Sequence, residues 1–421
     1  MTSNVKPEPS LVKLPDPCVQ YLKWITVRLL EYSTKAPNIS QPDEEWITQQ
    51  VIYRYGKSYN HVINKQWDQI YPKIANPKIK RWICPLDITF EKIKEAYGGW
   101  GEYRYSEAAT HVMIYNLLTS AGLNQPISSI SIPPKINSFL IQPLEQKLQI
   151  SLSSNSSDNT VTTTTIIYPL TNAKPDILLP LNMVDNMGPY PTPFWSYNRK
   201  YNTEQHILWP LSSHIFTFQS GINDTCKWSD KKHKLVFRGA TTGPVKSFKT
   251  LDGNVKSSRF EIINQFAHCS WADFGFSTIV EHTKRTDPNW AHHEKQILAL
   301  KKKSMTIKEM LNYRFILCIE GNDVSTSFGW VLASHSVPIH PYPFMFEVWF
   351  FQGLQPWVHF IPCKVDGSDL EQQMKWAQEN DAECQKIAKK GREHMKRMLD
   401  PVLYVGILKR MCEIWDLRIK N

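Results

Sequence analysis

The sequence lacks the cysteine patterns that define disulfide scaffolds and zinc domains. Its eight cysteines are spread over 421 residues and include no Cys-x-x-Cys pair. Disulfides and zinc are therefore both disfavoured, and we expect no bound metal and a reducing compartment. The neighbouring His292 and His293 have no further ligands at metal spacing, so we interpret them as surface histidines.

Long apolar runs are also missing. No stretch approaches the ~20 apolar residues that cross a bilayer, and the first residues lack the apolar core of a signal peptide. We therefore expect a cytoplasmic protein without a transmembrane segment. Peripheral association with a membrane is compatible with this expectation.

Signatures of nucleic-acid binding are absent, although the net charge of +10, from 49 basic and 39 acidic residues, suits an anionic partner. Nucleic acid, an anionic membrane surface and a phosphorylated ligand would all match this charge. The sequence contains no zinc-finger spacing, basic zipper or RNA-recognition signature. Lysines concentrate locally at 301–303 and 386–397, where they have the pattern of solvated helix faces. We expect no nucleic-acid partner.

The chain is long enough for two or three domains, and its patterns divide it into four parts. Residues 1–40 are polar and proline-spaced, which indicates a tail or a strap on the first domain. Residues 41–230 predict an N-terminal α/β lobe, with helical spacing at 44–55 and strand-like apolar segments at 176–183, 206–210 and 214–218. The remaining parts are a Rossmann-like lobe at 231–385 and C-terminal helices at 386–421 that pack back toward the first lobe.

Strand and helix patterns alternate between residues 230 and 400. A strand at 234–237 precedes a loop of small residues at 238–243 and a helix at 258–268. A further strand at 357–362 is followed by charged amphipathic helices at 369–399. This alternation predicts a doubly wound, mostly parallel sheet. The expected fold class is α/β, with two lobes and a cleft between them.

The stretch from 314 to 341 is the most informative part of this alternation. It predicts a buried strand at 314–319, a break at Gly321, a helix capped by Ser325 or Thr326, and a strand from 336 to 339. A helix N-terminus that follows a buried strand offers free backbone N–H groups to a phosphate. A nucleotide or sugar-nucleotide site is therefore predicted here, and an ordinary strand-to-helix crossover is the alternative.

Several motifs together resemble one known family. They are Phe237-Arg238-Gly239-Ala240-Thr241-Thr242-Gly243, Arg259, Asn312-Tyr313-Arg314-Phe315, Glu320-Gly321-Asn322-Asp323-Val324-Ser325-Thr326, Ala333-Ser334-His335-Ser336-Val337 and Trp357-Val358-His359-Phe360-Ile361-Pro362. Their order and spacing resemble glycosyltransferase family 90, which comprises capsule-associated, lipopolysaccharide-modifying and protein O-glucosyltransferases. The resemblance covers roughly residues 175 to 400.

The resemblance implies a GT-B-like architecture of two Rossmann-like lobes with an interlobe cleft. It implies transfer of xylose or glucose from UDP-xylose or UDP-glucose to a hydroxyl of a glycan or glycoconjugate, with inversion and without a metal or other cofactor. The sequence agrees on one independent point, since no Asp-x-Asp motif ends an apolar strand. The leaving UDP would then be stabilised by arginine and backbone N–H groups.

A catalytic base is implied in the first lobe. Inverting transfer uses a general base beside the acceptor hydroxyl, which contributes a factor of about 10² to 10⁴. The family places an aspartate after a strand in the pattern Asn-x-x-Asp, which Asn182-Met183-Val184-Asp185 matches. Asp185 is therefore the predicted base, and capping of the following turn is its alternative role.

The first loop of the second lobe supplies predicted donor contacts. Arg238 follows a strand and could reach a phosphate, while Gly239 permits close backbone approach. Pairing of Arg238 with a carboxylate between the lobes is the alternative. Thr241 and Thr242 offer hydroxyl and N–H groups, or serve as turn residues. Arg259 matches an arginine that the family carries after this loop, and a surface position is its alternative.

The second loop supplies the remaining predicted contacts to the donor. Its backbone N–H groups would bind the diphosphate, its polar side chains would shape the loop and touch sugar hydroxyls, and a later carboxylate would hold a hydroxyl pair or lie at the rim. These residues are Ser325, Thr326 and Ser327 for the diphosphate, Asn322 and Asp323 for the loop, and Glu347 for the hydroxyls.

Three positions depart from the family pattern. The related glucosyltransferases carry an arginine where this chain has Thr241, and basic residues where it has Glu320 and Gly329. Each missing arginine would remove a charge-assisted contact worth ~1.5–3 kcal/mol. A non-catalytic sugar-binding or scaffold protein that retains the fold is therefore the alternative to an active transferase.

Overall fold

The computed structural model describes residues 35–56, 83–85, 178–182, 195–200, 206–243, 246–250, 253–280 and 290–416. Within these ranges the side chains of residues 37, 83–85, 178–182, 246–250, 253–257, 290–293 and 416 are not described. It also describes single residues within 20–32 and 110–118, and residue 59.

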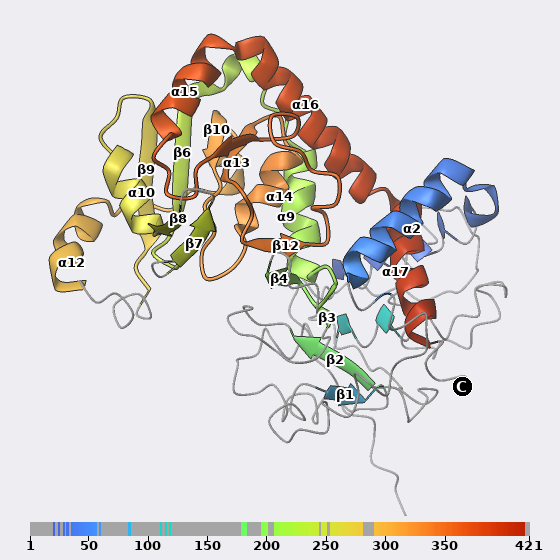
Figure 1. Cartoon of the computed structure of the whole chain (residues 1–421). Helices are drawn as coiled ribbons and strands as arrows, with labels where there is room; N and C mark the ends of the chain where they lie inside the picture. Colours follow the sequence, from blue (N-terminus) through green and yellow to red (C-terminus); the bar gives the residue numbers. More distant parts are fainter. Residues whose placement is uncertain are drawn as a thin grey trace, which may run out of the picture.

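A five-stranded parallel sheet forms the centre of the second half of the chain (Figure 1). Its strand order is β13-β11-β10-β6-β9, and every neighbouring pair is parallel. The strands are β6 (Lys232–Ala240), β9 (Ala272–Thr278), β10 (Tyr313–Leu317), β11 (Val337–Pro341) and β13 (Ile361–Cys363). The expected α/β class with a mostly parallel sheet is confirmed.

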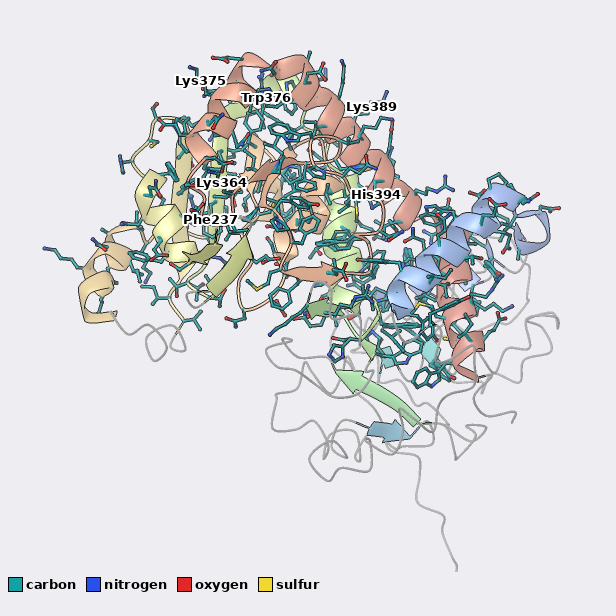
Figure 2. All side chains as sticks on the ribbon, in the orientation of Figure 1. Phe237, Lys364, Lys375, Trp376, Lys389 and His394 are labelled. Atoms are coloured by element: carbon teal, nitrogen blue, oxygen red, sulfur yellow. The ribbon has the colours of Figure 1, made fainter. Side chains whose placement is uncertain are left out.

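Helices cover both faces of this sheet because successive strand residues point to opposite sides. Leu235 and Phe237 of β6 pack in one core cluster with α10 (Arg259–Phe266) and α15 (Leu370–Glu379). Val236 lies between them in sequence and packs in the other cluster, with α9 (Ser212–Ile222) and α14 (Thr326–Leu332). The long α16 (Asp381–Met398) contributes side chains to both clusters. In Figure 2 the labelled Lys375 and Lys389 mark the outer surfaces of α15 and α16.

The strand order places a reversal of the chain between β6 and β10. Counted along the chain, the sheet strands lie in the order fifth, fourth, third, first, second. The connection from β6 runs to β9 on one side, whereas β10 pairs with the opposite side of β6. Ligands of doubly wound sheets bind outside the carboxyl ends of the strands at such a switch point.

One strand prediction was wrong, and another was wrong in part. Residues 214–218 lie in α9, whose buried Ile215, Phe218 and Gly221 recur at helical spacing. A short apolar run cannot be assigned to strand or helix by its period alone. Only the last two residues of the segment at 357–362 lie in a strand, since Trp357 has a left-handed backbone with φ 64° and β13 begins at Ile361.

Strands of the first half form a second sheet with the order β1-β2-β3-β5. These are β1 (Ile83–Pro85), β2 (Leu178–Asn182), β3 (Trp195–Ser196) and β5 (Ile207–Leu208). The next strand after β3, β4 (Asn198–Lys200), pairs instead with β12 (Phe346–Val348) from the second half. This pairing ties residues that precede the parallel sheet to the segment after β11.

The C-terminal helix returns to a helix near the start of the chain. The predicted helix at 44–55 is confirmed as α2 (Gln41–Tyr55), which Ser40 caps by accepting a hydrogen bond from the Asp43 N–H. It contacts α17 (Pro401–Asp416), and the two lie side by side in Figure 1. The remaining elements are η1 (Ala36–Asn38), η5 (Trp228–Asp230), β7 (Lys246–Thr250), β8 (Gly253–Ser257), α12 (Trp290–Ala299) and α13 (Ile307–Met310).

The described part of the chain contains no helix that is long and apolar enough to cross a bilayer. The same residues contain no group of three or more His, Cys, Asp or Glu side chains placed to hold a metal. His292 and His293 belong to α12, but their side chains lie outside the described set.

Candidate functional site

The loops that follow β6 and β10 meet at the switch point of the sheet. The Gly243 N–H donates to Asn322 Oδ1 over 3.2 Å. A Cβ on Gly243 would lie 3.1 Å from the Gly321 carbonyl oxygen, and the φ of Gly243 is +100°. Glycine is therefore favoured at Gly243 both by its backbone conformation and by the close approach of the second loop. The two loops that the sequence singled out separately are one structural unit.

Arg259 at the start of α10 joins these loops. Its Nη1 donates to the Ala240 carbonyl and the Thr242 hydroxyl, both over 2.8 Å. Its Nη2 donates to the Ile319 carbonyl over 2.8 Å. A Cβ on Gly321 would lie 2.9 Å from Arg259 Nη2, so glycine also makes room for the guanidinium. Arg259 is partly buried and links the carboxyl ends of β6 and β10. The alternative interpretation, that Arg259 lies at the surface, was wrong.

The Arg259 guanidinium places a positive charge between the two loops. It lies over the Phe237 ring, with 5.6 Å from Cζ to the ring centroid, and Figure 2 labels this phenylalanine. Burial lowers the pKa of Arg259 to about 10, while the charges of Asp323 and Glu320 act in the opposite direction. The side chain therefore stays protonated at neutral pH. Its buried Nε has no hydrogen-bond partner in the structure described.

Asp323 connects the second loop to the first half of the chain. Its Oδ2 accepts a hydrogen bond from Asn198 Nδ2 over 2.9 Å and another from the Tyr197 hydroxyl. Both partners follow directly after β3, and Ser196 of β3 is in register with Asn182 of β2. The contacts give Asp323 a role in shaping the loop, whereas its contact with a sugar hydroxyl stays a prediction.

Glu320 has a structural task that explains its departure from the family pattern. The side chain is buried, and its Oε1 accepts from the backbone N–H groups of Met345 and Phe346 over 3.2 and 3.3 Å. The carboxylate thus fixes the start of β12 beside the second loop. A basic residue has no acceptor to offer these two N–H groups.

Glu347 is held by an arginine from the opposing strand. Arg199 Nε donates to Glu347 Oε2 over 2.7 Å across the β4–β12 pair. The remaining Arg199 donors contact the carbonyls of Tyr53, Arg54 and His206 over 2.9, 3.2 and 3.2 Å. This ion pair connects α2 with β12. A contact between Glu347 and a ribose or sugar hydroxyl stays a prediction.

Arg238 forms an ion pair within the sheet. Its Nη2 donates to Asp273 Oδ1 over 2.7 Å, and its Nη1 donates to the carbonyls of Asp273 and Phe237. Tyr313 and Lys302 donate to the same carboxylate over 2.5 and 3.0 Å. Burial raises the pKa of Asp273, but these hydrogen bonds outweigh it and hold the pKa well below its usual range. Arg238 therefore pairs with a carboxylate, which lies on β9 of the same sheet, and its phosphate contact stays a prediction.

The other predicted residues of the first loop shape its backbone. The Thr241 N–H donates to the Thr278 carbonyl over 3.0 Å, and the Thr241 hydroxyl accepts from the Val280 N–H over 2.9 Å. The register of β6 against β9 shifts between Gly239 and Ala240. Thr241 is buried, so a small side chain that can bond the end of β9 suits this position.

The helix after the second loop begins as the sequence predicts. Thr326 is its first residue, and Ser325 occupies the N-cap position without a side-chain capping bond. The Ser325 and Ser327 hydroxyls lie 2.9 Å apart and bond each other. Thr326 is exposed, whereas Ser325 is buried. Thr326 is thus the most accessible of the three serine and threonine side chains.

Gly329 allows α14 to pack directly on α9. A Cβ at Gly329 would lie 2.1 Å from the Phe218 ring, and one at Gly221 would lie 2.1 Å from the Trp330 carbonyl oxygen. Real Cβ contacts are never this short, so each side chain larger than hydrogen would push the helices apart. The absence of a basic residue at Gly329 follows from this close packing.

Gly329→Ala is expected to destabilise the protein by about 3 kcal/mol, because overpacking the contact with Phe218 outweighs the helix-propensity gain of about 1 kcal/mol from Gly to Ala. The free energy of unfolding would be measured by urea titration. Gly406→Ala in α17 is the matched control, since the nearest atom to its Cβ would be a terminal methyl of Ile47 at 3.0 Å. Equal stability of the two variants would contradict the packing argument.

Sequence reasoning missed the partners that hold the site together. Tyr197, Asn198 and Asp273 carry no local motif, because each acts on a residue that is distant in sequence. Asp185 lies outside the described residues, three positions after the end of β2. Its role as the base stays a prediction.

Comparison with known proteins identifies the relatives of this chain. The profile of the family described as "Glycosyl transferase family 90" matches residues 192–403, which is half of the chain. The chain is 27% identical over 203 residues to "O-glucosyltransferase LpsA" of Dichelobacter nodosus, covering 48% of this chain and 54% of that protein. It is 30% identical over 186 residues to "Uncharacterized protein 027R" of Frog virus 3 (isolate Goorha), covering 41% of this chain and 18% of that protein.

A human protein matches a shorter part of the chain. "Protein O-glucosyltransferase 3" of Homo sapiens is 29% identical over 117 residues, covering 27% of this chain and 23% of that protein. The chain thus spans about half or less of the length of these curated relatives. The profile match includes both loops, Arg259 and the whole parallel sheet. On this evidence the chain belongs to glycosyl transferase family 90.

Proposed function

We propose that this chain is an inverting, metal-independent glycosyltransferase that moves glucose or xylose from a UDP-sugar to a hydroxyl of a glycan or glycoconjugate. The observation that carries the proposal is the meeting of two family loops around the Arg259 guanidinium at the switch point of the sheet. A guanidinium held between two loops suits a diphosphate, because the guanidinium and the backbone N–H groups of the loops can both donate hydrogen bonds to it. The name of the LpsA relative agrees with a transferred glucosyl group.

The proposed donor site lies between the ends of β6 and β10. Arg259 would supply charge to the diphosphate, and the glycines of both loops would allow backbone N–H groups to approach it. Thr242 and Thr326 would add hydroxyl contacts, since neither is fully buried. Arg238, through Asp273, and Glu347, through Arg199, would position the strands beside the donor. Gly239, Thr241, Asn322, Asp323, Ser325 and Ser327 would complete the site.

The proposed architecture is GT-B-like, with a tail or strap at 1–40 and an acceptor-side lobe at 41–230. The donor lobe would span 231–385, and the helices at 386–421 would pack back on the first lobe. Contact between α17 and α2 supports the last point. The β4–β12 pair and the Asp323 contacts support a cleft whose two sides are linked near the donor loop.

The proposed reaction is a single displacement. The Asp185 carboxylate would take the proton of the acceptor hydroxyl as its oxygen bonds to the anomeric carbon of the sugar. The bond from that carbon to the β-phosphate oxygen would break on the opposite face, and UDP would leave with the electron pair. Asn182 is in register with Ser196, and the next two residues, Tyr197 and Asn198, donate hydrogen bonds to Asp323. This arrangement supports a base close to the donor loop. The cytoplasm stays the predicted compartment.

UDP is expected to stabilise the protein, because a ligand that binds only the folded state raises its melting temperature. The full chain would be heated with UDP at millimolar concentration, and with UMP and ADP as matched controls. A panel of UDP-sugars would then be scored for hydrolysis and for transfer to glycan acceptors. No stabilisation by UDP would refute the donor site. Stabilisation by UDP without turnover of any sugar would identify a non-catalytic sugar-binding protein instead.

A further inference from the structure

Arg54 is a buried arginine whose side chain has no anionic partner among the described residues. It lies in the last turn of α2 and is 0% exposed. Its Nε, Nη1 and Nη2 atoms make no hydrogen bond with any part of the chain that the structure describes. The backbone carbonyl of Arg54, by contrast, accepts a hydrogen bond from Arg199 over 3.2 Å. The Arg54 backbone is therefore hydrogen-bonded, whereas none of its three side-chain nitrogens has a hydrogen-bond acceptor in the described part of the chain.

The Trp349 ring lies against this guanidinium and connects it to a cluster of aromatic side chains. Arg54 Cζ lies 5.1 Å from the centroid of the Trp349 ring. Tyr404 of α17 contacts the rings of Trp349 and Trp24 edge-on, with centroid distances of 5.7 and 5.1 Å. The hydroxyls of Tyr404 and Tyr21 lie 2.6 Å apart. The cluster therefore joins α2, α17 and the residues before α2.

This cluster is rich in donors. The indole N–H groups of Trp24 and Trp349 also have no hydrogen-bond acceptor in the described part of the chain. The titratable side chains that influence the pKa of Arg54 are those of Tyr404, Tyr21 and Tyr53, and no carboxylate of the described residues is among them. Arginine offers five N–H donors and no acceptor. The described residues of the cluster therefore lack an anionic acceptor for the hydrogen bonds that Arg54 can donate.

The Arg54 charge persists despite its burial. Burial lowers its pKa to about 10, which still leaves the guanidinium protonated at neutral pH. A cation over a tryptophan face recovers part of the lost hydration, but it satisfies none of the N–H donors. A buried charge without a hydrogen-bonded partner is strongly destabilising. A ligand that accepts several hydrogen bonds and carries negative charge would remove this cost.

We propose that Arg54 and Trp349 form a binding site for a small inorganic oxyanion of the phosphate or sulfate class. The planar guanidinium fork matches two oxygens of such an anion, and the Trp349 indole N–H can donate to another. The bound anion links α2 to α17 through the aromatic side chains that contact Tyr404. The site is separate from the proposed donor crevice, because it lies between α2 and α17 rather than at the ends of β6 and β10 (Figure 1).

Anion-dependent stability tests this site. The full chain would be dialysed exhaustively into chloride buffer, and its melting temperature followed on addition of phosphate or sulfate at constant ionic strength. A saturable rise of about 2 °C or more is expected for the wild type, and none for Arg54→Met. Ion chromatography of the denatured, dialysed protein would separately count anions that stay bound, with phosphate and sulfate distinguished by retention time.

Control variants separate this site from general salt effects and from the donor crevice. Arg410→Met removes an exposed arginine of α17 that pairs with Glu44, and it is expected to keep the response. Stabilisation by UDP reports that Arg54→Met is folded; if it is not, Arg54→Lys keeps the charge without the fork and is expected to weaken the response.

Three results would overturn the proposal. The first is a wild type that neither responds to phosphate or sulfate nor releases them. The second is a response that survives in Arg54→Met, which would place the anion elsewhere. The third is an Arg54→Met variant that is more stable than the wild type in every anion, which would mean that Arg54 lies in the core without a ligand.

Discussion

Arg259→Met is expected to weaken UDP binding by about 10- to 100-fold, because a charge-assisted hydrogen bond contributes about 1.5–3 kcal/mol. The change removes the buried guanidinium that joins the Ala240 and Ile319 carbonyls and the Thr242 hydroxyl. The free energy of unfolding is expected to fall by about 3 kcal/mol, since three acceptors lose their donor. Calorimetric titration with UDP and urea unfolding would measure the two effects.

Two further variants separate charge from scaffold effects. Arg314→Met is the matched control, because Arg314 lies on β10 but donates to Asp381 and the Trp228 carbonyl, away from the two loops. It is expected to lose stability and keep UDP affinity. Arg259→Lys keeps the charge without the fork and should fall between wild type and Arg259→Met. A folded Arg259→Met protein with unchanged UDP affinity would show that Arg259 serves the loops alone.

Asp185→Asn is expected to lower the rate of sugar transfer by about 10² to 10⁴ while UDP binding is retained, because the amide cannot accept the acceptor proton. The substitution preserves size and changes only the charge and basicity of the side chain. The measurement compares kcat for transfer with the dissociation constant of UDP in the same preparation. A large loss in kcat with unchanged UDP affinity is the pattern of a base that acts in the transition state.

An exposed aspartate provides the control for this variant. Asp230 lies at the end of η5, outside the two loops, and Asp230→Asn is expected to keep both transfer and UDP affinity. Loss of UDP binding together with transfer in Asp185→Asn would show that Asp185 supports the structure of the cleft. Unchanged transfer would assign the base to another residue.

The parallel sheet could be predicted from sequence because its signals are local. Apolar runs bounded by glycine and polar loops marked β6 and β10, and Ser325 marked the start of α14. Fully buried strands have this continuous apolar pattern. The run at 214–218 has the same local appearance, but it lies in a helix. Its buried residues Ile215 and Phe218, together with Gly221, recur at helical spacing.

Partner choice among buried charges could not be predicted. Arg199 and Glu347 lie 148 residues apart in sequence, and Arg238 and Asp273 lie 35 apart. Each pair depends on the register of two strands, and no local pattern encodes that register. The sequence therefore indicated that these residues matter near the loops, without indicating what each one contacts.

The sequence by itself determined the family, the parallel sheet and the identity of the two loops, because motif order, apolar period and glycine placement are properties of short segments. Tertiary structure alone decided that the loops meet at the β6–β10 switch point, that Arg259 joins them, that Glu320 accepts hydrogen bonds from the start of β12, and that Gly329 allows α14 to pack on α9. These contacts arise between segments far apart in the chain, and only the folded packing of strands and helices brings them together.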